Sequence, residues 1–79
     1  TTIRVFYAAQ NKNSKGKWMP VICYGYPLQD NTLEVLKRRI REERRARYWA
    51  RKNPLKGKVR IMKVTLTEVF KTIVVKEEV

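Results

Sequence analysis

Only one segment of this 79-residue chain has the apolar spacing of a helix, and the segments on both sides of it are rich in β-branched and aromatic residues. Leu33, Leu36 and Ile40 recur at i, i+3 and i+7, which is the spacing of one helical face. Pro54 ends the segment, because the residue before a proline avoids the helical region. We therefore expect a single helix, from about residue 32 to residue 52.

The start of this helix carries its own signal. Asn31 can accept a hydrogen bond as the N-cap, and Glu34 follows where its side chain can reach back. At 1.5 Å per residue the expected helix is about 30 Å long, whereas three strands side by side are about 10–15 Å wide. The second half of the helix should therefore overhang the sheet.

The rest of the chain predicts strands. Three stretches are β-prone, and they cover residues 2–9, 18–26 and 59–75. The polar residues 10–17 predict a hairpin loop, and Pro20 indicates that the second strand either lies at a sheet edge or is bulged there. The last stretch is long for one strand and could divide near Thr67. Because no glycine, proline or asparagine marks a turn there, we favour one bulged strand with a frayed tail over 76–79.

These elements predict the fold class. The order is β-β-α-β, in one small α+β domain over residues 1–79. We expect a mainly antiparallel sheet of three or four strands with one long Arg-rich helix on one face.

Positive charge is concentrated in the expected helix. Residues 37–52 contain nine basic residues, seven of them arginine, and only Glu42 and Glu43 as acids, so they carry +7 of the formal net charge of +12. The guanidinium group is a planar fork that binds phosphate through two hydrogen bonds. The predicted nucleic-acid-binding residues are Arg38, Arg41, Arg44, Arg45, Arg47, Trp49, Arg51 and Lys52 on the helix, with Lys12, Lys15 and Lys17 in the first loop.

Two other interpretations of this charge stay open. The basic residues can be a solvated helix face, paired with acids three or four positions away. They can also bind the carboxylates of an acidic protein partner, with Trp49 as an anchor. A membrane surface is not expected, since Leu33, Leu36 and Ile40 are needed in the core and leave no broad apolar face to insert.

The expected strands are apolar on both faces, yet one helix covers only one face of a small sheet. Trp18, Tyr24 and Tyr26 share one side of the second strand. The open face can complete the core, form a homodimer interface, or stack unpaired bases. Cys23, on the opposite side of that strand, is expected to be a buried small hydrophobic residue.

Composition argues against an enzyme. The chain has no histidine, one cysteine and seven scattered acids, so histidine-dependent catalysis, an internal disulfide and a zinc cluster are excluded. The three glycines are isolated and form no phosphate-binding loop. We expect no catalytic residues, no metal and no cofactor.

Two stretches, GKWMPVICYGY at 16–26 and GKVRIMKVTLTEVFKTI at 57–73, resemble small accessory proteins of tailed phages and prophages. This resemblance implies a cytoplasmic setting in a bacterial host, and a role in nucleic-acid metabolism or in binding a host protein. It agrees with the absence of a signal-peptide pattern in residues 1–9 and of an apolar run long enough to span a membrane. The sequence thus predicts a small nucleic-acid-binding accessory protein, largely sequence-independent, with DNA and RNA both open.

Overall fold

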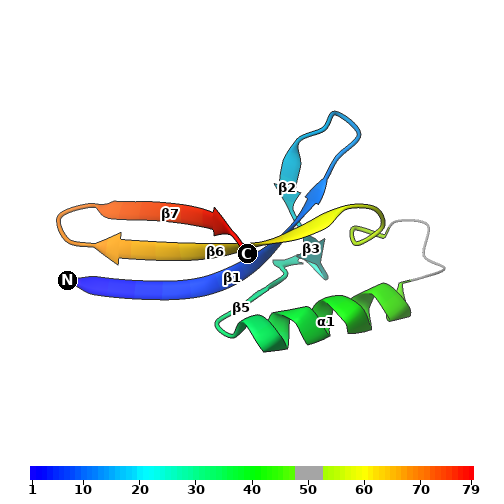
Figure 1. The fold of residues 1–79 in the computed structure, drawn as a ribbon, viewed down its shortest axis with the longest axis horizontal. Coiled ribbons are helices and arrows are strands. Elements are labelled where there is room, and N and C mark those ends of the chain that lie inside the picture. Colours follow the sequence, from blue (N-terminus) through cyan, green and yellow to red (C-terminus); the bar gives the residue numbers. More distant parts are fainter. Residues whose placement is uncertain (48–52) are drawn as a thin grey trace.

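The computed structural model describes residues 1–47 and 53–79 of the chain (Figure 1). Its elements in chain order are β1 (Thr2–Lys12), β2 (Trp18–Pro20), β3 (Ile22–Cys23), β4 (Tyr26–Pro27), β5 (Gln29–Asp30), α1 (Leu33–Ala46), β6 (Val59–Glu68) and β7 (Thr72–Glu78). The α+β class is confirmed, with a mainly antiparallel sheet. The described residues form more strands than the three or four expected, because both the second and the third predicted strands are divided.

The main sheet has the strand order β2-β1-β6-β7, and β5 also pairs with β1. The long ladder joins β1 to β6, from Thr2 opposite Glu68 to Asn11 opposite Val59. Every pairing is antiparallel. β3 and β4 form a separate two-stranded ladder.

The strand predicted over residues 18–26 is interrupted opposite Ala9 of β1. The Ala9 N–H donates to the carbonyl of Leu28 at 3.0 Å, and the Ala9 carbonyl accepts the N–H of Val21 at 3.1 Å. β2 and β5 therefore occupy consecutive parts of one edge of β1, and residues 21–28 leave the sheet between them. A single strand over 18–26 was wrong, because the chain turns away from β1 directly after Pro20. The edge position expected for Pro20 is confirmed.

The core lies between α1 and the part of the sheet around Ala9. Leu36 and Ile40 are buried, as the apolar spacing predicts, and Cys23 is buried as expected. The other buried members of this cluster are Ala9, Val21, Leu28 and Leu55. Burial of this stripe, more than intrinsic helix propensity, accounts for the helix at this position.

Both ends of α1 differ from expectation. Thr32 is the N-cap and makes no side-chain capping bond, while Asp30 Oδ1 accepts the Thr32 N–H at 3.0 Å. The helix ends at Ala46, and Arg47 is the C-cap, so an uninterrupted helix to Lys52 was wrong. Ile40 is the last buried residue of α1, and Ala46, the one apolar residue of the helix beyond it, is exposed.

Residues 59–75 form two strands where we favoured one. A 17-residue strand at about 3.3 Å per residue would be about 56 Å long, while the longest extent of the molecule is 46 Å. The chain reverses through Val69, Phe70 and Lys71 without a glycine, so strand pairing overrides local turn preference. The tail is not frayed, because β7 includes Glu78 and the Val79 N–H donates to Ile61 at 2.9 Å.

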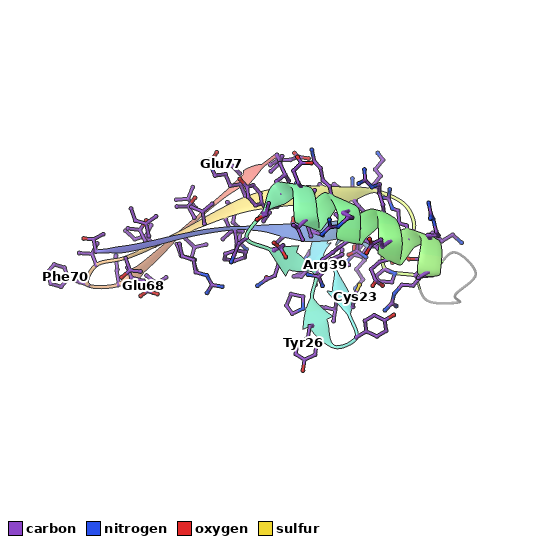
Figure 2. The ribbon with its side chains drawn as sticks, turned by 90° about the horizontal axis from the view of Figure 1, so that it is seen from below. Cys23, Tyr26, Arg39, Glu68, Phe70 and Glu77 are labelled. Atoms are coloured by element: carbon purple, nitrogen blue, oxygen red, sulfur yellow. The ribbon has the colours of Figure 1, made fainter. Side chains whose placement is uncertain are left out.

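The far half of the main sheet extends beyond the helix. This distal arm consists of residues 2–6 of β1, 64–68 of β6, the turn 69–71 and residues 72–76 of β7 (Figure 1). Figure 2 shows Phe70 and Glu68 at its tip, at the opposite end of the molecule from the C-terminal end of α1. The arm is apolar on both sides: Ile3, Ile73 and Val75 on one face and Val74 on the other are all exposed.

Candidate functional site

The exposed side of α1 carries the basic residues. Leu36 and Ile40 face the sheet, while Arg38, Arg41 and Arg45 recur at i, i+3 and i+7 on the solvent side. These three arginines line a shallow groove of about 350 Å³ together with Glu42 and Ala46. The helix therefore brings three of the predicted binding residues onto one surface, which we call the arginine face.

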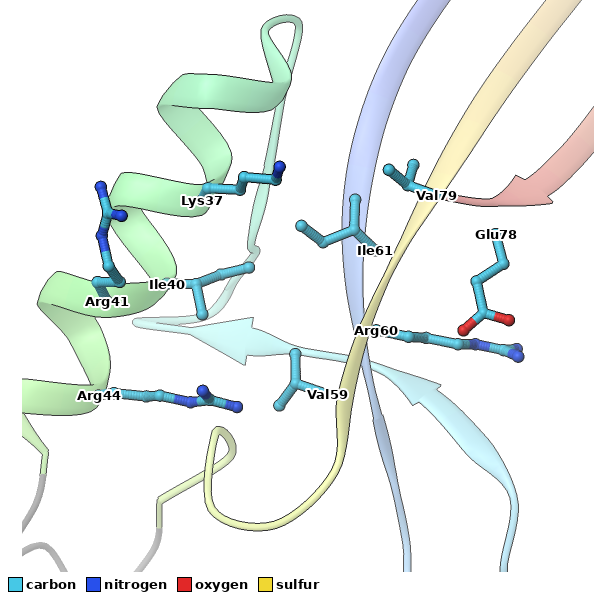
Figure 3. Close-up of a pocket in the computed structure, with 9 residues that line it drawn as sticks. All are labelled: Lys37, Ile40, Arg41, Arg44, Val59, Arg60, Ile61, Glu78 and Val79. Carbon is cyan, nitrogen blue, oxygen red and sulfur yellow. The ribbon is translucent and has the colours of Figure 1, made fainter.

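A second groove lies between α1 and the end of β6 (Figure 3). It has a volume of about 640 Å³ and an apolar floor made by Ile40, Val59, Ile61 and Val79. Lys37 and Arg44 reach from the helix toward β6 above this floor. Arg60 and Glu78 point to the other side of β6, away from the helix. The groove thus combines an apolar floor with a cationic wall from α1.

Two arginines of this region already pair with acids. Arg47 Nε donates to Glu43 Oε2 at 3.0 Å, and this hydrogen bond raises the pKa of the Arg47 guanidinium. Arg39 lies 4.0 Å from Asp30 and donates to the carbonyl of Gln29 at 3.1 Å. Of these two arginines only Arg47 was a predicted binding residue, and its half-buried side chain links the end of α1 to Glu43.

Arg44 is tied to the backbone. Its Nε donates to the carbonyl of Leu55 at 3.3 Å, across from the end of the helix to the segment that leads into β6. By contrast, within residues 1–47 and 53–79 no ion pair involves Lys37, Arg38, Arg41 or Arg45. These four cations are exposed.

The predicted lysines of the first loop lie elsewhere. Lys15 and Lys17 are at the tip of the β1–β2 hairpin, which projects away from α1 (Figure 1). Lys12 belongs to β1 and not to the loop, so that placement was wrong. Its ammonium group lies 5.9 Å from the centre of the Trp18 ring, and the Arg60 guanidinium lies 4.3 Å from the centre of the same ring. The structure therefore does not bring the lysines together with the arginine face.

Trp49, Arg51 and Lys52 lie outside the described residues. The predictions that place them in the binding surface therefore stay predictions.

Two of the aromatic residues that are exposed in the described part of the chain lie on the β3–β4 hairpin. Tyr24 and Tyr26 are each 76% exposed, and the Arg47 guanidinium lies 4.6 Å from the Tyr24 ring. Tyr24 has φ 54° and Gly25 has φ 80°, as a tight two-residue hairpin turn of type I′ requires. The Tyr24-Gly25 dipeptide was the sequence signal that could have predicted this turn, but asparagine or aspartate is the usual residue before the glycine.

The remaining chemistry of the described part is sparse. Cys23 is a buried core residue, and this burial raises the pKa of its thiol above the ordinary value. No group of three or more acidic, cysteine or histidine side chains gathers as metal ligands in the ranges the structure describes. Within the same ranges, no helix has the length and apolar composition needed to cross a membrane.

Comparison with protein-family models, with curated proteins and with solved structures gave no match to this chain.

Proposed function

We propose that this protein binds nucleic acid through the arginine face of α1, largely without sequence preference. One observation carries the proposal: Arg38, Arg41 and Arg45 share an exposed helix surface, and none forms an ion pair among the described residues. Like charges at this spacing destabilise a helix that has no partner. A row of phosphates relieves this repulsion, and arginine binds phosphate through its planar fork.

The whole-chain charge supports the same partner class. At a formal net charge of +12 the protein attracts any polyanion over a long range. Affinity that comes from phosphate contacts falls steeply with salt, because bound cations release counterions from the nucleic acid. If about six phosphates are neutralised, the slope of log K against log salt is about −5.

Fluorescence anisotropy with labelled single- and double-stranded DNA and RNA across a salt series tests this proposal. Replacing Arg38, Arg41 and Arg45 with glutamine should weaken binding and make the slope shallower by about 2.7, at 0.9 per phosphate contact. The matched control replaces Lys12, Lys15 and Lys17 with glutamine, which removes the same charge from a different place. Equal losses in both variants, or a wild-type slope near zero, would overturn the proposal.

An acidic protein partner is the second candidate, and the groove of Figure 3 favours it. Its apolar floor of Ile40, Val59, Ile61 and Val79 offers a contact that phosphates do not use. A peptide with alternating acidic and apolar residues would fit both the floor and Lys37. Capture of one protein from nuclease-treated lysate that is lost in Ile61→Glu, but kept in the Arg38, Arg41 and Arg45 variant, would favour this candidate over nucleic acid.

A further inference from the structure

We propose that two copies of this chain pair edge to edge through β7, antiparallel and centred on Val74, to make one continuous sheet. This inference does not rest on nucleic-acid binding. β7 is the last strand in the order β2-β1-β6-β7, and every one of its residues is exposed. Residues 72–75 are uncharged and β-prone, which makes an open edge a template for another strand.

The peptide groups available for pairing can be identified. The Val79 N–H donates to Ile61 at 2.9 Å, so the odd-numbered residues of β7 bond inward to β6. Because these bonds alternate along an antiparallel strand, Thr72, Val74 and Lys76 turn their peptide groups outward. A two-fold axis at Val74 pairs these outward groups with the same groups of the second copy.

The charges on the edge select this register. With the axis at Val74, Ile73 lies opposite Val75 of the second copy, and Lys71, the turn residue directly before β7, comes level with its Glu77. Opposite charges and β-branched pairs at facing positions stabilise a sheet. An axis at Val75 instead sets Ile73 against Glu77, and an axis at Lys76 sets Lys76 against itself.

The other open edge of the arm is a poorer site. Residues 2–6 of β1 have no partner on their outer side among the described residues, because β5 begins to pair at Tyr7. Self-pairing of this whole segment is centred on Arg4 and places two arginines face to face. Like charges at directly opposite positions are destabilising.

Packing of two arms face to face is also a poorer arrangement. The exposed apolar face around Ile3, Val5, Ile73 and Val75 spans three strands and two side-chain rows. It offers about 200 Å² at the usual strand and residue spacings, against about 800 Å² per partner in a stable interface. Edge pairing depends on backbone hydrogen bonds and needs no such area.

The symmetry has a consequence for α1. A two-fold axis perpendicular to the sheet keeps each face on its own side, so both helices lie on the same face of the continuous sheet that the two five-stranded sheets form. The dimer therefore presents two arginine faces on one side.

Disulfide trapping tests the pairing and its register in the absence of nucleic acid. In a Cys23→Ala background, Val74→Cys should give a disulfide-linked dimer on mild oxidation, since facing residues have Cα atoms about 5.5 Å apart. Val75→Cys is the matched control, because its own copy lies on a diagonal about 7–8 Å away. Circular dichroism confirms that both variants fold.

A charge swap with light scattering provides the second arm. Lys71→Glu and Glu77→Lys should each reduce the mass from twice the 9.5 kDa chain mass to one chain, and the double variant should restore the dimer. A monomeric wild-type protein overturns the proposal, as does a dimer that links through Val75→Cys but not through Val74→Cys. Because neither arm contains nucleic acid, loss of this proposal leaves the proposed function standing, and the reverse also holds.

Discussion

The side-chain amide of Asn11 donates to the carbonyl of Pro54 at 2.8 Å, across 43 positions of the sequence. This bond joins the end of β1 to the segment that follows the helix. Next to it, Leu55 is 1% exposed and belongs to the core. The Asn11–Pro54 hydrogen bond and buried Leu55 thus hold the segment that follows α1 against the sheet.

Asn11→Ala should therefore lower the free energy of unfolding by about 1 kcal/mol, the usual net value of a hydrogen bond whose loss leaves a carbonyl unpaired. Urea denaturation measures the change. Lys58→Ala, an exposed substitution close by, is the control and should stay within about 0.5 kcal/mol of the wild type. Equal effects of the two substitutions would show that the amide bond contributes nothing.

Leu36→Ala should cost about 2–5 kcal/mol, because its fully buried side chain fills the space between α1 and the sheet. Leu33→Ala is the comparison on the same helical stripe. Leu33 is only partly buried, so its substitution should cost less stability. A chain this small has little stability to spare, and denaturation curves with and without a stabilising osmolyte keep both variants measurable.

Gly25→Ala should destabilise the β3–β4 hairpin, because φ at this position is 80° and a β-carbon is strained there. The expected loss is about 1 kcal/mol. Nothing lies near the site of the added β-carbon, so the loss comes from backbone strain and not from a clash. Gly25→Asn tolerates positive φ better and should lose less; an alanine variant as stable as the asparagine variant would contradict this account.

The stability should fall at alkaline pH through Cys23. Burial is the main cause that raises the pKa of this thiol, Arg47 opposes it and Glu43 adds to it. The unfolded chain then loses its thiol proton at a lower pH than the folded chain. This loss of stability through the Cys23 thiol is absent below about pH 8. It sets in as pH rises through the unfolded-state pKa of about 8.5.

The measurement is the free energy of unfolding between pH 7 and pH 9.5 for the wild type and for Cys23→Ala. The two proteins differ only at position 23, so the difference between the two curves isolates the thiol. The wild type should lose more stability than the variant over this interval. Parallel curves would show that the Cys23 thiol does not titrate differently in the two states.

Local chemistry was enough to predict several features of this protein. The spacing of Leu36 and Ile40 predicted the buried stripe of α1, because a helical period is a property of neighbouring residues. The burial of Cys23 and the edge position of Pro20 followed from residue type in the same way. The exposed Arg38, Arg41 and Arg45 were also accessible from the pattern, as the opposite face of that stripe.

Other features depend on contacts between distant residues. The chain reverses at Val69–Lys71 although no glycine, proline or asparagine there predicts a turn. The pairing of β7 with β6 determines this reversal. The exit of residues 21–28 is decided by Ala9, whose two backbone bonds go to Val21 and Leu28. The separation of the hairpin lysines from the arginine face follows from the same pairings, since it depends on where β1 runs in the sheet. Strand pairing is non-local, so residue order determined which segments can be strands and a helix, and only the tertiary structure decided which surfaces they share.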